Sequence, residues 1–251
     1  MTCGVEGGVW STKGGVVAHE VTEPPAQKEN PVTSVILSAR TLQMAEPSIV
    51  EESVKATIND VIASLPNPTD LSEQARRGII ARYTSVLEGN FIYWMTGTYL
   101  SLRSEESKSI IVDNLLEEVR DSHPAMLRRF AIAARAVPTD ADAMSVYKEL
   151  TDVRMFVGRL SPVPLLVTMA FFEGFIQRFM SFLADLANLQ GSTEQEYTEV
   201  HGVCDIAHTQ GLFNALSAET RLLPSSSELG LFEGVELLRA LIQRIVTPIE
   251  A

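Results

Sequence analysis

The sequence predicts an all-α fold, and three observations support this prediction. From about residue 47 onward, apolar residues recur at helical spacing between short breaks. No stretch alternates apolar and polar residues as a half-buried strand does. The 251 residues, 45% of them hydrophobic and 21% charged, suffice for one well-buried core. We expect a single helical domain over residues 46–251, preceded by a disordered leader over residues 1–45.

Composition and charge exclude several classes of protein. The leader is rich in Gly, Pro and polar residues, and it lacks the basic start and continuous apolar core of a secretory signal. The net charge of −12 argues against binding to nucleic acid or to anionic lipid. Cys3 and Cys204 lie far apart, so they predict neither a disulfide framework nor a zinc knuckle. These observations favour a cytoplasmic protein.

About seven helical segments are expected in order along the chain. The first covers residues 46–65 and opens near a Ser48 cap. The second covers residues 70–102, opens at an Asp70 cap and is expected to bend at Gly89 or Gly97.

The third segment, residues 104–137, starts from Ser104 and contains Pro124. Proline lacks a backbone donor and clashes with the preceding turn, so we expect a kink or break near His123. The remaining segments cover residues 140–160, 162–191, 192–216 and 227–246. Residues 162–176 form the longest apolar run, but Pro164 and Glu173 interrupt it before the ~20 apolar residues that span a bilayer, so no membrane segment is expected.

The segment "HGVCDIAH" places His201, Asp205 and His208 at intervals of four and three. At about 100° per residue these side chains lie at roughly 0°, 40° and 340° around a helix, so they can converge on one point. Histidine is a common metal ligand, although such a stripe is also compatible with surface polarity or with a local His–Asp hydrogen bond.

Glu173 stands in "MAFFEGFIQRF", where apolar residues surround it on all sides of a helix. An ionised, unpaired carboxylate in such a place costs several kcal/mol. Glu173 must therefore be protonated, paired with an arginine such as Arg178, or bound to a cation.

Further candidate ligands lie on other helices. Glu88 is flanked by apolar and aromatic neighbours, and His123 follows the acidic pair Glu117–Glu118. Each alone is compatible with an ordinary helix-surface position. Carboxylates from three helices that face a helix with two histidines are the pattern by which bundles hold a pair of iron or manganese ions. Zinc sites usually have fewer carboxylates.

These residues resemble a known family, the haem-oxygenase-like non-haem di-iron oxidases and oxygenases. The resemblance covers residues ~70–217 and depends on Glu88, "NLLEEVRDSHPAMLRRF", "FFEGF" and above all "HGVCDIAH", which has the family's H-x3-D-x2-H spacing. It implies a seven-helix bundle with the metal site between central helices. It also implies two groups of ligands, one for each iron: Glu118, His123 and His208; and Glu88, Glu173, His201 and Asp205.

The sequence departs from the family pattern around His123. Arg120 stands where the family's "EExG" usually has glycine, and the intervals from Glu118 and Glu117 to His123 place neither glutamate on one helical face with it. This segment must be irregular or must become ordered around the metal. Glu117 stays an alternative to Glu118 as a metal ligand, and Asp113 is a less favoured third candidate.

The resemblance implies a reaction in which Fe(II) ions activate O2 and a small carboxylate is oxidised. The substrate would be an amino acid or a fatty-acid-like molecule, and the outcome desaturation, cyclisation, C–C cleavage or N-oxygenation in a specialised-metabolite pathway. An external electron donor and a homodimer are left open. An arginine could hold the substrate carboxylate, and aromatic residues could form the pocket wall. The candidates are Arg128, Arg129, Arg154, Arg159 and Arg178 for the first role, and Tyr93, Trp94, Phe171, Phe172 and Phe175 for the second.

Two other functions are compatible with the sequence. A thiaminase-like hydrolase of the same fold would need no metal and would use Cys204 as nucleophile. A non-catalytic helical interaction protein would need no metal or active site, and the side chains of its polar stripe would hydrogen-bond only to one another.

Overall fold

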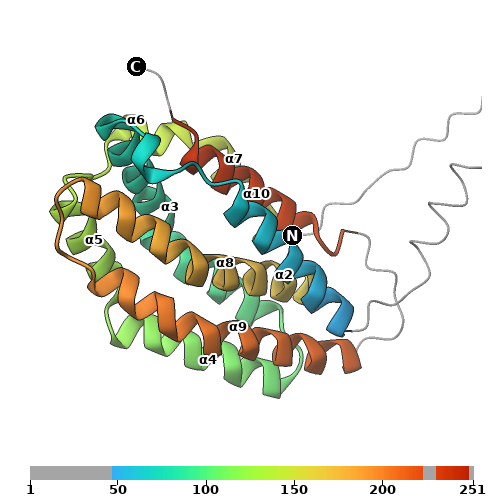
Figure 1. Ribbon diagram of the computed structural model, residues 1–251. Coiled ribbons are helices and arrows are strands. Elements are labelled where there is room, and N and C mark those ends of the chain that lie inside the picture. Colours follow the sequence, from blue (N-terminus) through green and yellow to red (C-terminus); the bar gives the residue numbers. More distant parts are fainter. Residues whose placement is uncertain (1–46, 223–229, 249–251) are drawn as a thin grey trace, which may run out of the picture. The chain divides into compact units, whose positions relative to one another are not determined.

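The computed structural model describes residues 47–222 and 230–248. These residues form nine α-helices and one short 3-10 helix, with no strand among them (Figure 1). The all-α prediction is confirmed for this part of the chain. The predicted leader, residues 1–45, lies outside it.

Helix α8, Pro162–Leu189, occupies the centre of the bundle. It is apolar on nearly all sides, as expected for a helix buried all round. Helix α9, Glu196–Leu222, runs along α8, and α4, Glu105–Arg120, packs on α9 (Figure 1). Helices α2, Pro47–Ala63, and α10, Glu233–Val246, cover other sides of α8.

By length and composition alone, α8 could cross a membrane, because the whole helix is longer than the apolar run considered above. In the structure 83% of its most apolar window is buried inside the bundle. This burial fits a core helix, and buried polar groups on α8 such as Glu173 then face other helices rather than lipid.

Helix α3, Glu73–Ser101, is kinked in its middle. Glu88 has ψ 81° and Gly89 has φ 105°, both outside the helical region. A φ of this sign is accessible to glycine and strained for other residues, so Gly89 is the residue that permits the kink. The predicted bend is thus confirmed at Gly89, whereas Gly97 is helical and packs against Val157.

The predicted cap residues of the first two helices are wrong. The N-cap of α3 is Ser72, whose hydroxyl accepts a hydrogen bond from the Ala75 amide, while Asp70 ends a 3-10 helix, Pro68–Asp70. Ser48 lies inside the first turn of α2. Before α3, Asp70 and Ser72 stand two residues apart, and only the backbone path decides which of them caps the helix.

The predicted break beside Pro124 is confirmed. Helix α4 ends at Arg120, Ser122 adopts a left-handed conformation with φ 60°, and α5, His123–Ala133, begins at the histidine with proline in its first turn. Ser104 caps α4 as expected, by accepting a hydrogen bond from the Ser107 amide. The break lets residues on α4 and the start of α5 face the same neighbours.

Residues 140–160 form two helices instead of one, α6, Asp140–Ser145, and α7, Tyr147–Val157. Thr139 and Asp142 form a capping box at the start of α6. Asp142 also accepts two hydrogen bonds from the Arg77 guanidinium, at 3.0 and 2.9 Å, which ties α6 to α3. This split and the break before His123 account for the two helices beyond the expected seven.

Candidate metal centre

Six of the seven predicted ligands lie close together in the interior of the bundle. They come from the α4–α5 break, from α8 and from α9, and all are buried. They are Glu118, His123, Glu173, His201, Asp205 and His208.

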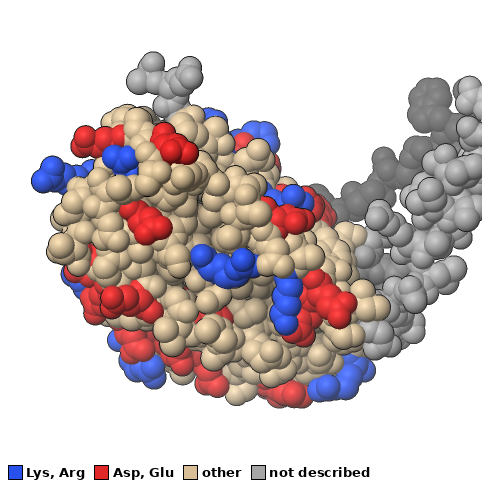
Figure 2. Space-filling model, in the orientation of Figure 1, with Lys and Arg blue, Asp and Glu red and all other residues tan. Residues whose placement is uncertain are grey.

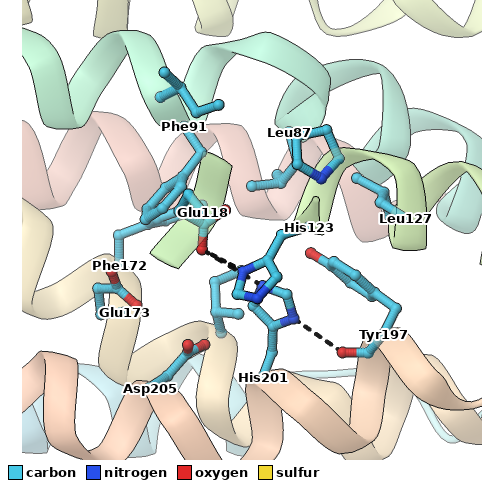
Figure 3. A pocket seen from close by; sticks show the side chains of 13 residues that line it. Leu87, Phe91, Glu118, His123, Leu127, Phe172, Glu173, Tyr197, His201 and Asp205 are labelled. Carbon is cyan, nitrogen blue, oxygen red and sulfur yellow. Dashed lines mark hydrogen bonds and ion pairs between the residues drawn. The ribbon is translucent and has the colours of Figure 1, made fainter. Parts of the chain in front are cut away.

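The first group consists of Glu118, His123 and His201 (Figure 3). The Glu118 carboxylate lies 2.7 Å from Nδ1 of His123 and 3.8 Å from Nε2 of His201. One ligand atom from each residue lies within 4.8 Å of the others. This spacing lets the three side chains hold one metal ion.

The orientation of His201 favours metal binding. Its Nδ1 lies 2.9 Å from the main-chain oxygen of Tyr197, which can only accept a hydrogen bond. Nδ1 therefore carries the proton, and in the neutral ring Nε2 is left as a lone pair that faces Glu118. A backbone carbonyl that fixes the tautomer in this way is common behind metal-bound histidines.

The second group surrounds His208. Its Nδ1 lies 3.7 Å from Asp205 and 3.8 Å from Glu173, and its Nε2 lies 2.8 Å from the Glu117 carboxylate. The Cys204 thiol, which also lies within ligand distance, donates a hydrogen bond of 3.2 Å to Asp205. A histidine between three carboxylates indicates a second place for a cation beside the first group.

The carboxylates of the two groups differ in their protonation. Burial alone would raise the pKa of Glu118, but the hydrogen bond with His123 and the nearby His201 imidazole lower it to about 2. Burial raises the pKa of Glu173, and burial together with the Glu173 charge raises the pKa of Asp205 well above its usual range. Burial would lower the pKa of His208, but its contacts with Glu173 and Glu117 raise it to about 9, so this one imidazolium compensates the two buried carboxylates only in part.

One oxygen atom of each of these two carboxylates also lacks a hydrogen-bond partner. Glu173 Oε1 and Asp205 Oδ2 have no hydrogen-bond partner among the described residues. Buried polar atoms without a partner are rare and destabilising. A cation bound between these carboxylates would satisfy both oxygens, so the residues present fit a metal ion.

Glu88 is the one predicted ligand that the structure does not bring to the cluster. Its carboxylate accepts a hydrogen bond from Arg128, and its side chain is 32% exposed. Glu88 stands at the kink of α3, where the backbone at Glu88 and Gly89 is non-helical. The structure also pairs His201, not His208, with Glu118 and His123, which differs from the division that the resemblance implies.

The structure places Glu117 and Glu118, the two alternative ligands, in different groups. Glu118 reaches the first group and Glu117 reaches His208. The irregular segment that the sequence required is the break at Ser122, which turns His123 back toward α4. Asp113 is exposed on α4, outside both groups.

The alternatives to a metal site fit the structure less well. Arg178 hydrogen-bonds Asn59 at the surface, so the Glu173–Arg178 pair considered as an alternative is absent from the described residues. Burial and the neighbouring Asp205 raise the pKa of the Cys204 thiol strongly. A thiol with a raised pKa carries little thiolate, which a nucleophilic cysteine requires.

The other candidate arginines lie away from the cluster, each with its own partner. Arg128 pairs with Glu88, Arg129 with Glu196, Arg154 with Asn90 and Arg159 with Glu233. Among the candidate aromatic residues, Phe172 lines the pocket and Trp94 packs edge-on against it, whereas Tyr93 is 45% exposed and Phe171 and Phe175 lie in the core.

Tyr197 and Tyr83 are site residues that the sequence analysis missed. The Tyr197 ring packs on His201 with centroids 4.3 Å apart, and its hydroxyl lies 2.8 Å from that of Tyr83. Tyr197 stands four residues before His201, so it shares the helical stripe that "HGVCDIAH" defines, and this spacing could have revealed it.

A small pocket with a cavity volume of about 30 Å³ adjoins the cluster (Figure 3). Glu118, His123, Glu173, His201 and Asp205 form its polar end, and apolar side chains of α3, α5 and α8 form the rest. On the described face in Figure 2, acidic side chains gather along the edge that α4 and α9 form, and no extended basic patch is present.

No protein-family model matches this chain, and neither a curated protein nor a solved structure matches it significantly. The chemistry of the site therefore has to be inferred from its own residues.

Proposed function

We propose that this chain is an O2-dependent non-haem di-iron oxidase or oxygenase with a haem-oxygenase-like bundle. Its substrate would be a small carboxylate in a cytoplasmic specialised-metabolite pathway, with an amino acid as the foremost candidate. One observation carries the proposal: two adjacent groups of buried histidines and carboxylates include two carboxylate oxygens without a partner.

The donor set favours iron or manganese among the metals. Imidazole and carboxylate ligands in similar numbers suit these cations, whereas zinc sites usually contain fewer carboxylates. A pair of ferrous ions would supply the electrons that reduce O2 and thereby activate it to oxidise a C–H bond or an amine. The ligands would be the six clustered residues, with Glu117 also within reach of His208. Glu88 would have to leave Arg128 in order to join them.

The protein's own residues would prepare the site in three ways. Glu118 stays ionised because its pKa is about 2, so it offers a charged oxygen without first losing a proton. The Tyr197 carbonyl fixes the tautomer of His201. Phe91, Phe172 and other apolar side chains line the pocket beside the cluster, where they exclude water from a bound substrate.

Iron loading tests the proposal. The full chain, loaded anaerobically with Fe(II) and freed of unbound metal, should retain about two iron ions per chain. Exposure to O2 should then consume oxygen and give a transient visible absorption band. His201→Ala and Asp205→Ala should each lose tight binding of one ion without unfolding the bundle.

Gln210→Ala is the matched control, because Gln210 lies on the exposed side of the same helix. It should keep wild-type iron content. Full iron content and O2 reactivity in His201→Ala or Asp205→Ala would contradict the assignment. Activity that disappears in Cys204→Ala and does not depend on metal would support the thiaminase-like alternative instead.

A further inference from the structure

Cys204 lies beside the second group of candidate ligands. Its Sγ atom is 3.2 Å from Oδ1 of Asp205, and that oxygen is 3.7 Å from Nδ1 of His208. One ligand atom from each of these three residues lies within 4.8 Å of the others. Oε2 of Glu173 lies 3.8 Å from the same Nδ1 atom. Helices α8 and α9 thus bring one sulfur, one nitrogen and two carboxylates together.

The spacing of these atoms fits a tetrahedral metal ion. Zinc forms bonds of about 2.3 Å to thiolate sulfur and about 2.0–2.2 Å to nitrogen and oxygen, which place tetrahedral ligand atoms roughly 3.3–3.7 Å apart. The observed separations of 3.2, 3.7 and 3.8 Å need only small side-chain movements to reach these values.

Glu117 orients His208 for this role. Its carboxylate lies 2.8 Å from Nε2 of His208, and an ionised carboxylate can only accept a hydrogen bond. Nε2 therefore carries a proton, and in the neutral ring Nδ1 is the free ligand atom, on the side of Asp205 and Glu173. A carboxylate behind a histidine is a common arrangement at zinc sites.

Two buried oxygens indicate a cation here independently of the cysteine. Glu173 is 2% exposed and Asp205 is 1% exposed. Oε1 of Glu173 and Oδ2 of Asp205 have no hydrogen-bond partner among the described residues. A metal ion between them would provide the missing partner for both atoms.

The thiol distinguishes this position from the first group. Glu118, His123 and His201 offer only nitrogen and oxygen, which suit iron or manganese. Thiolate is a soft ligand that favours zinc over these metals. The two positions of the cluster therefore differ in the metal that they prefer.

We propose that Cys204 makes the second position a zinc site, with Asp205, His208 and Glu173 as the other ligands. The thiol and the imidazolium each release a proton to the solvent when the metal binds, and the positive charge of the ion stabilises the thiolate beside Asp205. Cys204 is partly exposed, so the released protons have a path to water.

The inference rests on the proposed function in one respect, because zinc would compete with the second iron for Asp205, His208 and Glu173. Zinc does not change its oxidation state, so a chain with zinc in this position would lack the second iron that O2 activation requires. Zinc would thus regulate the proposed oxidase by inhibiting it.

Co(II), a spectroscopic substitute for zinc, tests the ligand set on the full chain under anaerobic, reducing conditions. The wild type should show a sulfur-to-cobalt charge-transfer band in the near ultraviolet and the intense visible bands of tetrahedral Co(II). Cys204→Ser should lose the charge-transfer band, and its affinity for Zn(II), measured against a chelating dye, should fall at least about tenfold. Cys3→Ser is the matched control, because it removes the chain's only other thiol and should keep both the band and the affinity.

Competition between the metals tests the regulatory part. The chain is equilibrated anaerobically with equal concentrations of Fe(II) and Zn(II) and freed of unbound metal, and both metals are then counted. The wild type and Cys3→Ser should retain about one zinc and one iron ion per chain, whereas Cys204→Ser should retain mostly iron.

Three results would overturn the inference: a wild-type Co(II) spectrum without the charge-transfer band, a band that persists in Cys204→Ser, and a zinc affinity that this substitution leaves unchanged. Loading with Fe(II) alone is measured on the same preparations. Two iron ions per chain without a thiolate band would contradict this inference and leave the proposed function standing. A thiolate band in a chain that takes up no iron would contradict the proposed function and leave the zinc site standing.

Discussion

Glu173 is 2% exposed, and its Oε1 atom has no hydrogen-bond partner among the described residues. Its pKa is raised by burial, and the nearby Asp205 carries a second carboxylate in the same surroundings. In the metal-free protein this arrangement lowers the folding stability, and a bound cation would restore it. Destabilisation of this kind is typical of residues retained for a function rather than for the fold.

We therefore predict that Glu173→Gln stabilises the metal-free protein, by about 1–2 kcal/mol, because it removes a buried carboxylate without changing the side-chain volume much. Urea denaturation in the presence of a chelator measures the change. Glu199→Gln is the control, since Glu199 is exposed on the neighbouring helix α9 and its substitution should leave the stability unchanged. A metal-free Glu173→Gln protein less stable than the wild type would show that the carboxylate is already well compensated.

Half of the cluster could be predicted from the sequence because its convergence depends on local spacing. His201, Asp205 and His208 share a stripe of one helix, so the period of the helix alone brings them together. Glu88 could not be placed in the same way. Its side-chain direction depends on a non-helical ψ at the kink and on an arginine from another helix. The Tyr83–Tyr197 hydrogen bond likewise joins residues of two helices.

At the scale of single elements, the kink of α3 depends on Gly89. No atom lies within 4 Å of the position that a Cβ would take there, so space does not exclude a side chain, but the φ of 105° does. Any other residue must either accept the strain or straighten the helix and move Glu88.

Gly89→Ala should therefore destabilise the protein by about 1–2 kcal/mol. Gly202→Ala is the matched comparison: Gly202 lies inside α9 without a positive φ and likewise has open space around it. Alanine there should stabilise the helix, by up to about 1 kcal/mol. Thermal unfolding of both variants measures the difference, and a stabilising Gly89→Ala would mean that α3 prefers to be straight.

Asp142 joins two elements, because it caps α6 and accepts the Arg77 guanidinium from α3. Partial burial alone would raise its pKa, but the hydrogen bonds from Thr139 and Arg77 lower it. A carboxylate with a lowered pKa in the folded state stabilises the protein above its unfolded pKa of about 3.9, and this contribution disappears as the pH falls below that value.

We predict that Asp142→Asn lowers the free energy of unfolding by about 1–3 kcal/mol at pH 7, since both the capping box and the ion pair lose the charge. The difference from wild type should shrink as the pH falls below about 4, because the native carboxylate is then protonated as well. Denaturation curves between pH 3 and pH 7 provide the measurement. A difference that is constant across this range would exclude the charge as its cause.

At the scale of the whole molecule, the cluster links three parts of the bundle: the α4–α5 break, α8 and α9. A metal ion that binds there connects these parts and binds only to the folded chain. The sequence predicted the helical class and the break, because helical periodicity and proline act locally. The sequence could not predict which helices pack against one another, because this packing depends on contacts between segments far apart in the chain.

We predict that divalent metal raises the stability of the whole chain. A ligand at a hundred times its dissociation constant stabilises a folded protein by about 2.7 kcal/mol, so Mn(II), as a less oxidisable substitute for Fe(II), should raise the urea midpoint progressively with its concentration. In His123→Ala most of this rise should be lost. An equal rise in that variant would place the bound metal elsewhere on the acidic surface.

The apolar character of α8 also matters during synthesis of the protein. Its most apolar window meets the length and composition of a membrane span, and α9 and α10, which cover it in the finished bundle, follow it in the chain. When α8 leaves the ribosome, these partners have not yet emerged from it. For that interval the nascent chain exposes apolar surface of the kind that chaperones and membrane insertion machinery bind.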